Sequence, residues 1–284
     1  MATKKQPENR NQSKSSASAA PRAAKKSDSL AGTQSIRRAV SILKEISSFG
    51  KKGIRLVDIA NAMQLERPTV HRMMRGLMSQ GMVTQDPKTK TYRLGPVVYE
   101  LGLAATPYHN LREICQPSLQ SLANRTGDSI FLVVRSGMDV VCIDNLDGDF
   151  IIKARTLDIG VRRPLGVGAG SLALLLQLNE DEAEQVIAAN KPRFPLFGTL
   201  TEQKLRHAME QSRKLGYAIN DEDVMPGVIA LGAPILNSNG TSYAAISIAG
   251  ISSRMQEPRR DQIARLLLRE TRAISRELAN HQAY

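Results

Sequence analysis

Cationic and hydrogen-bonding side chains gather in residues 65–80 and form the first candidate site. Apolar residues recur there at helical spacing, which predicts a helix with one buried stripe made of Val70, Met73, Met74, Leu77 and Met78. The other face carries the candidate contact residues Arg67, Thr69, His71, Arg72 and Arg75. Arginine can donate paired hydrogen bonds to guanine or phosphate, so this face suits the DNA major groove. A solvated basic surface is the commoner cause of such a pattern, and the neighbouring elements must decide.

A glycine-rich run at residues 166–171, Gly-Val-Gly-Ala-Gly-Ser, is the second candidate site. It fits neither phosphate-binding signature, because the third glycine of the dinucleotide fingerprint is misplaced and no Gly-Lys-Ser/Thr follows. A glycine-rich approach to a helix still leaves backbone N–H groups free to bind a carboxylate. Gly168, Ala169, Gly170 and Ser171 are therefore candidate anion ligands. The alternative is a tight strand-to-helix turn that glycine permits.

Catalysis and metal binding find no support in the sequence. The acidic run at residues 221–223 has no histidine or cysteine near it, so a solvated loop or pocket mouth is the favoured interpretation. The four histidines are scattered, and no Ser/His/Asp or Cys/His constellation stands out. Cys115 and Cys142 lie in apolar contexts, which predicts reduced core residues. We expect no catalytic residue, no metal and no cofactor.

The elements around residues 65–80 follow the order of a winged helix-turn-helix. Residues 35–48 predict a helix whose inward face holds Ile36, Ala39, Val40, Leu43 and Ile46. A second short helix at 56–63 precedes the candidate helix by a tight turn. Two short strands, 81–86 and 91–94, then form a hairpin, or wing. Lys88 and Lys90 at its tip, with Arg38 of the first helix, are the candidate phosphate contacts.

The net charge of +12 is concentrated in the first third of the chain. Residues 1–30 carry seven Lys and Arg against two Asp and Glu, residues 31–102 carry twelve against five, and residues 103–284 carry twenty of each sign. Such segregation favours a polyanion partner, either nucleic acid or an acidic membrane surface. The sequence has no apolar run long enough for a membrane helix and no secretory leader, so we expect a cytoplasmic, DNA-binding protein without a membrane partner.

The chain divides into four predicted segments: a disordered basic tail at 1–31, a winged helix-turn-helix domain at 32–95, a linker helix at 96–115 and an effector-binding domain at 116–284. The last segment alternates hairpin-joined strands with helices, two of them capped by Asn179 and Thr201. Residues 150–152 are expected to extend its sheet. The predicted fold class is α+β with an antiparallel sheet, because no parallel nucleotide-binding pattern is present.

From about residue 32 to residue 278, the chain resembles the IclR family of bacterial transcriptional regulators. The resemblance is carried by ordered blocks: SIRRAVSIL (35–43), RPTVHR (67–72), YRLG (92–95), GVRRPL (160–165), GYA (216–218), PGV (226–228), API (233–235) and AAISIAG (244–250). It implies an N-terminal winged helix, a C-terminal GAF-like effector domain, and homodimers or homotetramers assembled through both. It also implies a small organic acid from a catabolic pathway as the effector.

The chain departs from the family pattern in the expected pocket. Asn220 stands where an aspartate is frequent, although Asp221 follows it; Ala230 stands where many members have a cysteine, and Ala249 replaces a common serine. Ser247 is either an effector ligand or a small packed residue. The pocket is thus less polar than in members that bind very small keto acids, so we expect a larger or aromatic acid.

The predicted function is that of a transcriptional regulator whose operator binding responds to an organic acid. Two hypotheses remain beside it. An enzyme that processes a small acid, with a DNA-binding appendage, would turn over the bound acid. A non-specific nucleoid-type binder would bind random DNA equally well and show no effector response.

Overall fold

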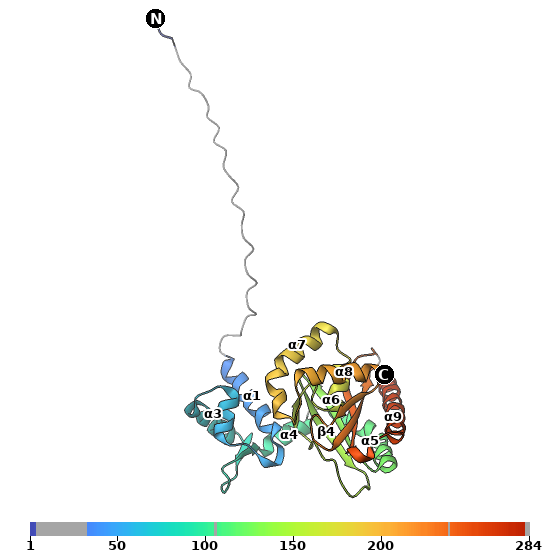
Figure 1. Ribbon diagram of the computed structural model, residues 1–284. Helices are drawn as coiled ribbons and strands as arrows, with labels where there is room; N and C mark the ends of the chain where they lie inside the picture. Colours follow the sequence, from blue (N-terminus) through green and yellow to red (C-terminus); the bar gives the residue numbers. More distant parts are fainter. Residues whose placement is uncertain (4–32, 105–106, 238, 282–284) are drawn as a thin grey trace.

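The computed structural model describes residues 1–3, 33–104, 107–237 and 239–281. Almost all of the predicted basic tail, residues 1–31, lies outside the described residues. Figure 1 shows a small helical domain beside a larger domain built around a sheet. The helix-turn-helix and the α+β class predicted from the sequence are both present.

The small domain is a three-helix unit with a two-stranded hairpin. Its elements are α1 (Gln34–Ser48), η1 (Gly50–Lys52), α2 (Leu56–Met63), α3 (Arg67–Ser79), β1 (Val83–Gln85) and β2 (Tyr92–Leu94). Val70 and Met74 of α3 pack against Ile42, Ile46 and Ile59 from the other two helices. The turn before α3 is tight because Gln64 adopts a left-handed conformation with φ 51°. This packing holds α3 with one face inward and one face to solvent.

The inward face of α1 differs from the predicted one. Ile42 and Ile46 are buried, but Ile36 and Val40 are 63% and 45% exposed. Helix α1 carries more apolar surface than α2 and α3 can cover, and periodicity alone did not show which stripe finds a partner. Met78, expected in the buried stripe of α3, is also exposed.

Two helices stand where one linker helix was expected. Helix α4 (Pro96–Ala104) buries none of its residues, and α5 (Pro107–Thr126) continues through the predicted boundary at residues 115 and 116. Leu111, Cys115 and Leu119 of α5 lie in the core of the large domain. The second half of the predicted linker is therefore structurally part of that domain.

The large domain is built on a six-stranded antiparallel sheet with the strand order β5-β4-β3-β8-β7-β6. The strands are β3 (Ser129–Ser136), β4 (Asp139–Asp147), β5 (Arg162–Pro164), β6 (Ala218–Asp221), β7 (Val228–Leu236) and β8 (Ser242–Ile251). Side chains alternate along β3, so that Ile130 and Leu132 enter one core and Phe131 and Val133 enter the other. Both faces of the sheet are therefore buried.

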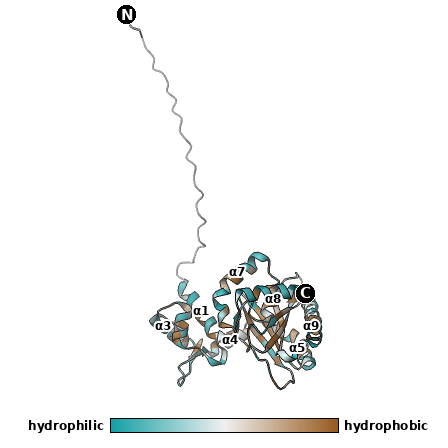
Figure 2. Cartoon of the chain, in the orientation of Figure 1, coloured by the Kyte–Doolittle hydropathy of each residue, from teal (hydrophilic) through white to brown (hydrophobic). Residues whose placement is uncertain are grey.

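Helices cover the two faces of this sheet. Helices α5 and α9 (Arg259–His281) enclose the first core. The second core lies under α6 (Ala169–Leu175), α7 (Glu180–Asn190), η2 (Lys191–Leu196) and α8 (Glu202–Leu215), while η3 (Ser252–Arg254) precedes α9. Asn179 and Thr201 cap α7 and α8 as expected, by accepting hydrogen bonds from Glu182 N at 2.9 Å and Lys204 N at 3.2 Å. Figure 2 shows hydrophobic strands inside hydrophilic outer helix surfaces.

The expected strand at residues 150–152 is wrong. Residues 148–161, called the strap below, run without regular structure from β4 to β5. Ile151 is 92% exposed, and the edge of the sheet beside β4 is occupied by β5 instead. The short apolar run fitted a strand by composition, but it pairs with no strand in the described part of the chain.

Candidate functional site

The exposed face of α3 presents the side chains predicted to contact DNA. His71, Arg72 and Arg75 are exposed, while Val70 and Met74 on the opposite face are fully buried. None of these cations forms an ion pair with a described carboxylate. Their donors are therefore available to an external acceptor, as major-groove recognition requires.

The N-terminal end of α3 and the first helix meet at an open groove. It brings together Arg38, Arg67 and Thr69, three candidates that are up to 31 residues apart in the chain. A surface groove with two arginines at a helix N-terminus is suited to a phosphate group of the backbone.

The wing presents Lys88 and Lys90 at its tip. Asp86 shapes this turn, because its carboxylate accepts hydrogen bonds from Lys88 N at 2.8 Å and Thr89 N at 3.0 Å. The hydrogen bonds from Thr89 and Lys88 lower the pKa of Asp86. Both lysines are exposed, so the hairpin holds two cations where a backbone phosphate can reach them.

A cavity of about 40 Å³ lies in the large domain between the sheet, α6 and the strap. Seven of the eight predicted effector residues line it: Gly168, Ala169, Gly170, Ser171, Asn220, Ala230 and Ser247. Apolar side chains form most of the remaining wall, among them Phe131, Val133, Leu157 and Val228. The sheet and α6 approach closely here, since a Cβ on Gly232 would lie 2.2 Å from Ala169 O.

Two of the predicted residues differ from expectation in detail. Asp221 is exposed and does not line the cavity, because neighbours on a strand point to opposite faces and Asn220 points inward. Ser171 lines the cavity, but its hydroxyl accepts from Gly166 N at 2.8 Å and donates to Pro164 O at 3.2 Å. It therefore holds the turn before α6. Asn220 and Ser247 form no side-chain hydrogen bond with any described residue, so their polar atoms are free to meet a ligand.

Arg163 is the charged residue of the cavity lining, and sequence reasoning missed it. Its guanidinium lines the cavity, donates to the carbonyl of Thr156 in the strap, and lies 5.8 Å from the centroid of the Phe197 ring. Burial lowers its pKa to about 10, and no described carboxylate lies within ion-pairing distance. The Arg162-Arg163 pair could have revealed it. Neighbouring residues on a strand face opposite sides, so one of two consecutive arginines must point toward the interior.

The comparisons with known proteins agree with this arrangement. The model "IclR helix-turn-helix domain" matches residues 35–87, and "Bacterial transcriptional regulator IclR C-terminal" matches residues 103–276. The chain belongs to the IclR family.

Curated IclR-family relatives match over nearly their full length. KipR of Bacillus subtilis is 27% identical over 80% of this chain and 91% of its own, and XynR of Escherichia coli is 27% identical over 86% and 97%. Among solved structures, an IclR-family regulator from Brucella abortus has a TM-score of 0.69 at 21% identity, covering 86% of this chain and 92% of its own. An IclR homolog from Microbacterium hydrocarbonoxydans, complexed with 4-hydroxybenzoate, has a TM-score of 0.64 at 21% identity, covering 86% and 98%.

The protein is thus a transcriptional regulator of the IclR family, with a DNA-binding and an effector domain, and not an enzyme. Over the described residues, no helix has the length and hydropathy to span a bilayer, and no cluster of three or more potential metal ligands occurs.

Proposed function

We propose that a carboxylic acid binds in the effector cavity, with Arg163 as its anchor, and thereby changes the affinity of the protein for its operator. The observation that carries this proposal is a largely buried arginine that has no carboxylate partner among the described residues and lines a mostly apolar cavity. Burying a charge is costly unless an opposite charge compensates it. A ligand carboxylate supplies that charge and is favoured over a neutral compound.

The rest of the cavity limits the kind of acid. Asn220 and Ser247 can hydrogen-bond a second oxygen of the ligand, and the apolar wall favours a hydrocarbon body. A volume of 40 Å³ holds about two or three water-sized groups. An aromatic acid, which we favour, therefore needs an outward shift of side chains such as Met225, which is 39% exposed. The 4-hydroxybenzoate complex of the Microbacterium homolog supports this class.

A thermal-shift screen tests the ligand class. Pyruvate and glyoxylate represent short keto acids, benzoate and 4-hydroxybenzoate represent aromatic acids, and benzamide is the uncharged control. We expect stabilisation by the aromatic acids and none by benzamide. Stabilisation by the short acids alone would overturn the aromatic class, and an equal response to benzamide would overturn the role of Arg163.

For the DNA complex, we propose that two recognition helices of an oligomer enter successive major grooves at a pseudo-palindrome. The proposed base or adjacent phosphate contacts are Arg67, Thr69, His71, Arg72 and Arg75. Arg38, Lys88 and Lys90 contribute salt-sensitive phosphate contacts. Replacing both lysines with alanine should reduce the salt slope of binding by about two. We propose that the protein acts in the cytoplasm, together with its DNA partner.

The proposed oligomer needs a surface through which two copies of the chain contact each other, and the structure offers a candidate. Tyr99, Leu101 and Leu103 of α4 are exposed, as are Ile36 and Val40 of α1. Exposed apolar side chains of this kind favour self-association. Light scattering of Leu103→Glu should show a smaller species than the wild-type protein, whereas an unchanged mass would exclude α4 from the interface.

A further inference from the structure

The DNA-binding domain contacts the effector domain along β5 and the end of the strap. Helix α1 packs beside β5. A Cβ built on Gly50 of η1 would lie 3.1 Å from Val161 Cγ2. A shallow groove at this contact is lined by Ile46, Ser47, Gly50, Lys51, Arg93, Leu94, Ile159 and Gly160. The DNA-binding domain therefore contacts the end of the strap, which directly follows the cavity-lining residues Thr156 and Leu157 in the chain.

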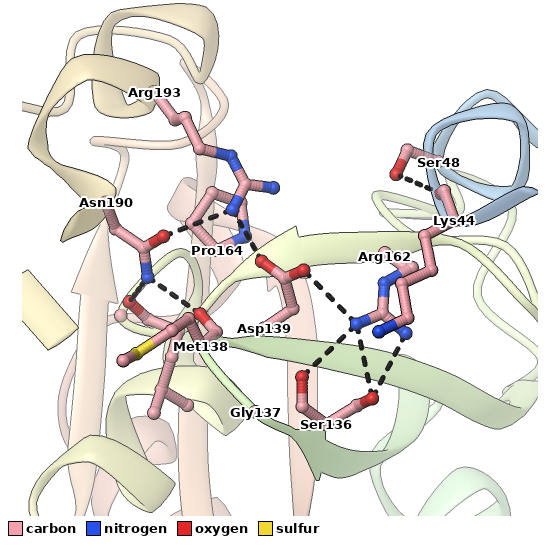
Figure 3. A network of polar contacts seen from close by, with 12 residues as sticks. Lys44, Ser48, Ser136, Gly137, Met138, Asp139, Arg162, Pro164, Asn190 and Arg193 are labelled. Carbon is pink, nitrogen blue, oxygen red and sulfur yellow. Dashed lines mark hydrogen bonds and ion pairs between the residues drawn. The ribbon is translucent and has the colours of Figure 1, made fainter. Parts of the chain in front are cut away.

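A cluster of charged side chains lies at the same contact (Figure 3). Asp139 accepts hydrogen bonds from Arg162 at 3.2 Å and from Arg193 at 2.6 Å. Arg162 also donates to Ser136 Oγ and O, both at 3.2 Å. Figure 3 places Lys44 and Ser48 of α1 beside this cluster.

Glu45 is the residue of α1 that interacts electrostatically with the cluster. Its side chain is half-buried. Burial raises the pKa of Glu45, Arg193 opposes this increase, and Asp139 adds to it. A carboxylate within electrostatic range of both a cation and an anion is sensitive to small shifts in their positions.

Strand β5 joins this cluster to the cavity. Its residues pair with β4 on one side only, with Val140 opposite Arg163 and Val141 opposite Arg162. Because neighbours on a strand face opposite sides, Arg162 reaches the cluster while Arg163 lines the cavity. Arg163 also donates to the Thr156 carbonyl of the strap. A ligand that draws the guanidinium away from Thr156 perturbs both segments that touch α1.

We propose that β5 and the strap are the joint through which cavity occupancy reaches the DNA-binding domain, with Glu45 responding to the position of the Asp139–Arg162–Arg193 cluster. The joint has the physical continuity that coupling between two sites needs, and its short edge strand is held by few hydrogen bonds. It rests on the proposed function only in taking the cavity ligand to be an acid.

Hydrogen–deuterium exchange of the full-length protein tests the joint without a ligand. The effect of Arg163→Met is measured in three proteins: the wild type, the Glu45→Gln variant, and the Glu100→Gln variant. Glu100→Gln is the matched control, because Glu100 is an exposed residue of α4. We expect Arg163→Met to change exchange in peptides covering residues 40–53 by about fivefold in the wild-type and control backgrounds. In the Glu45→Gln background this response should fall to less than half.

An equal response in the Glu45→Gln background, or no response in the wild type, would overturn the joint. Ile159→Ser, at a half-exposed position of the contact, provides a second variant with no buried charge involved and should weaken the response in the same way. The acid screen is a separate readout of the cavity. If no acid binds, the proposed function fails while the exchange result still decides the joint.

Discussion

Replacing Arg163 with methionine should make the protein more stable in the absence of acid and remove its response to acids. Methionine is close in length to the aliphatic part of the arginine side chain, lacks the guanidinium, and can adapt to a cavity wall without a charge. No described carboxylate pairs with Arg163, so the substitution does not leave a buried carboxylate unpaired. The substitution therefore separates the cost of a buried cation from the packing of the cavity.

The size of the effect follows from the pKa. Burial lowers the pKa of Arg163 from its ordinary 12.5 to about 10. A tenfold change in proton affinity corresponds to about 1.4 kcal/mol, so the buried charge costs about 3 kcal/mol. The lost hydrogen bond to Thr156 and the contact with Phe197 offset about 1–2 kcal/mol. The net gain is about 1–2 kcal/mol, or roughly 2–8 °C in Tm for a domain of this size.

The stabilisation expected for Arg163→Met applies at neutral pH. A cation whose pKa is depressed in the folded state destabilises that state fully at every pH below its folded pKa, here about 10. The penalty fades only as the pH rises above that value. Melting curves at pH 7 to 8 therefore measure the whole effect, and a scan toward pH 11 should bring the two proteins closer together.

The assay is calorimetry with and without benzoate. At a benzoate concentration one hundred times the Kd, the wild-type protein should gain about 2.7 kcal/mol, whereas the Arg163→Met protein should gain nothing measurable. Arg155→Met is the matched control, because Arg155 is an exposed strap residue paired with Asp147 at 2.6 Å and such pairs contribute little. A lower Tm for Arg163→Met, or an unchanged response to benzoate, would refute the reasoning.

Three further predictions concern the DNA face, the contact between β7 and α6, and the thiols. Arg72→Ala should abolish operator binding in a gel-shift assay while leaving the melting curve unchanged; wild-type affinity would refute its assignment. Gly232→Ala places a Cβ 2.2 Å from Ala169 O, so urea unfolding should show a loss of roughly 1–3 kcal/mol together with weaker acid binding. Burial raises the pKa of Cys115 and Cys142 to about 12, so a thiol reagent at pH 8 should label them only on unfolding, and rapid labelling of the native protein would contradict their burial.

Local features of the chain were predictable because they depend on neighbours in sequence. The spacing of Val70 and Met74 set the inward face of α3, and Asn179 and Thr201 marked the starts of two helices. The concentration of positive charge in the first third favoured a polyanion partner, either nucleic acid or an acidic membrane surface. Each of these signals spans only a few residues or sums over a segment.

The sequence-based predictions were wrong where burial depended on which other element packs against a helix face or a strand. Helix α1 has apolar residues on more than one side, and only the placement of α2 and α3 buries Ile42 while leaving Ile36 exposed. The run at residues 150–152 has strand composition, yet β5 takes the edge of the sheet beside β4. Composition and periodicity describe one segment, whereas burial depends on two.

The sequence by itself determined a winged helix with a basic outer face, an antiparallel α+β domain, and seven of the residues that line the cavity. Tertiary structure alone decided the charge inside that cavity. Arg163 becomes a buried cation only because the strap and Phe197, more than thirty residues away in the chain, close over it. Desolvation depends on everything packed around a group, so no short stretch of sequence can show it.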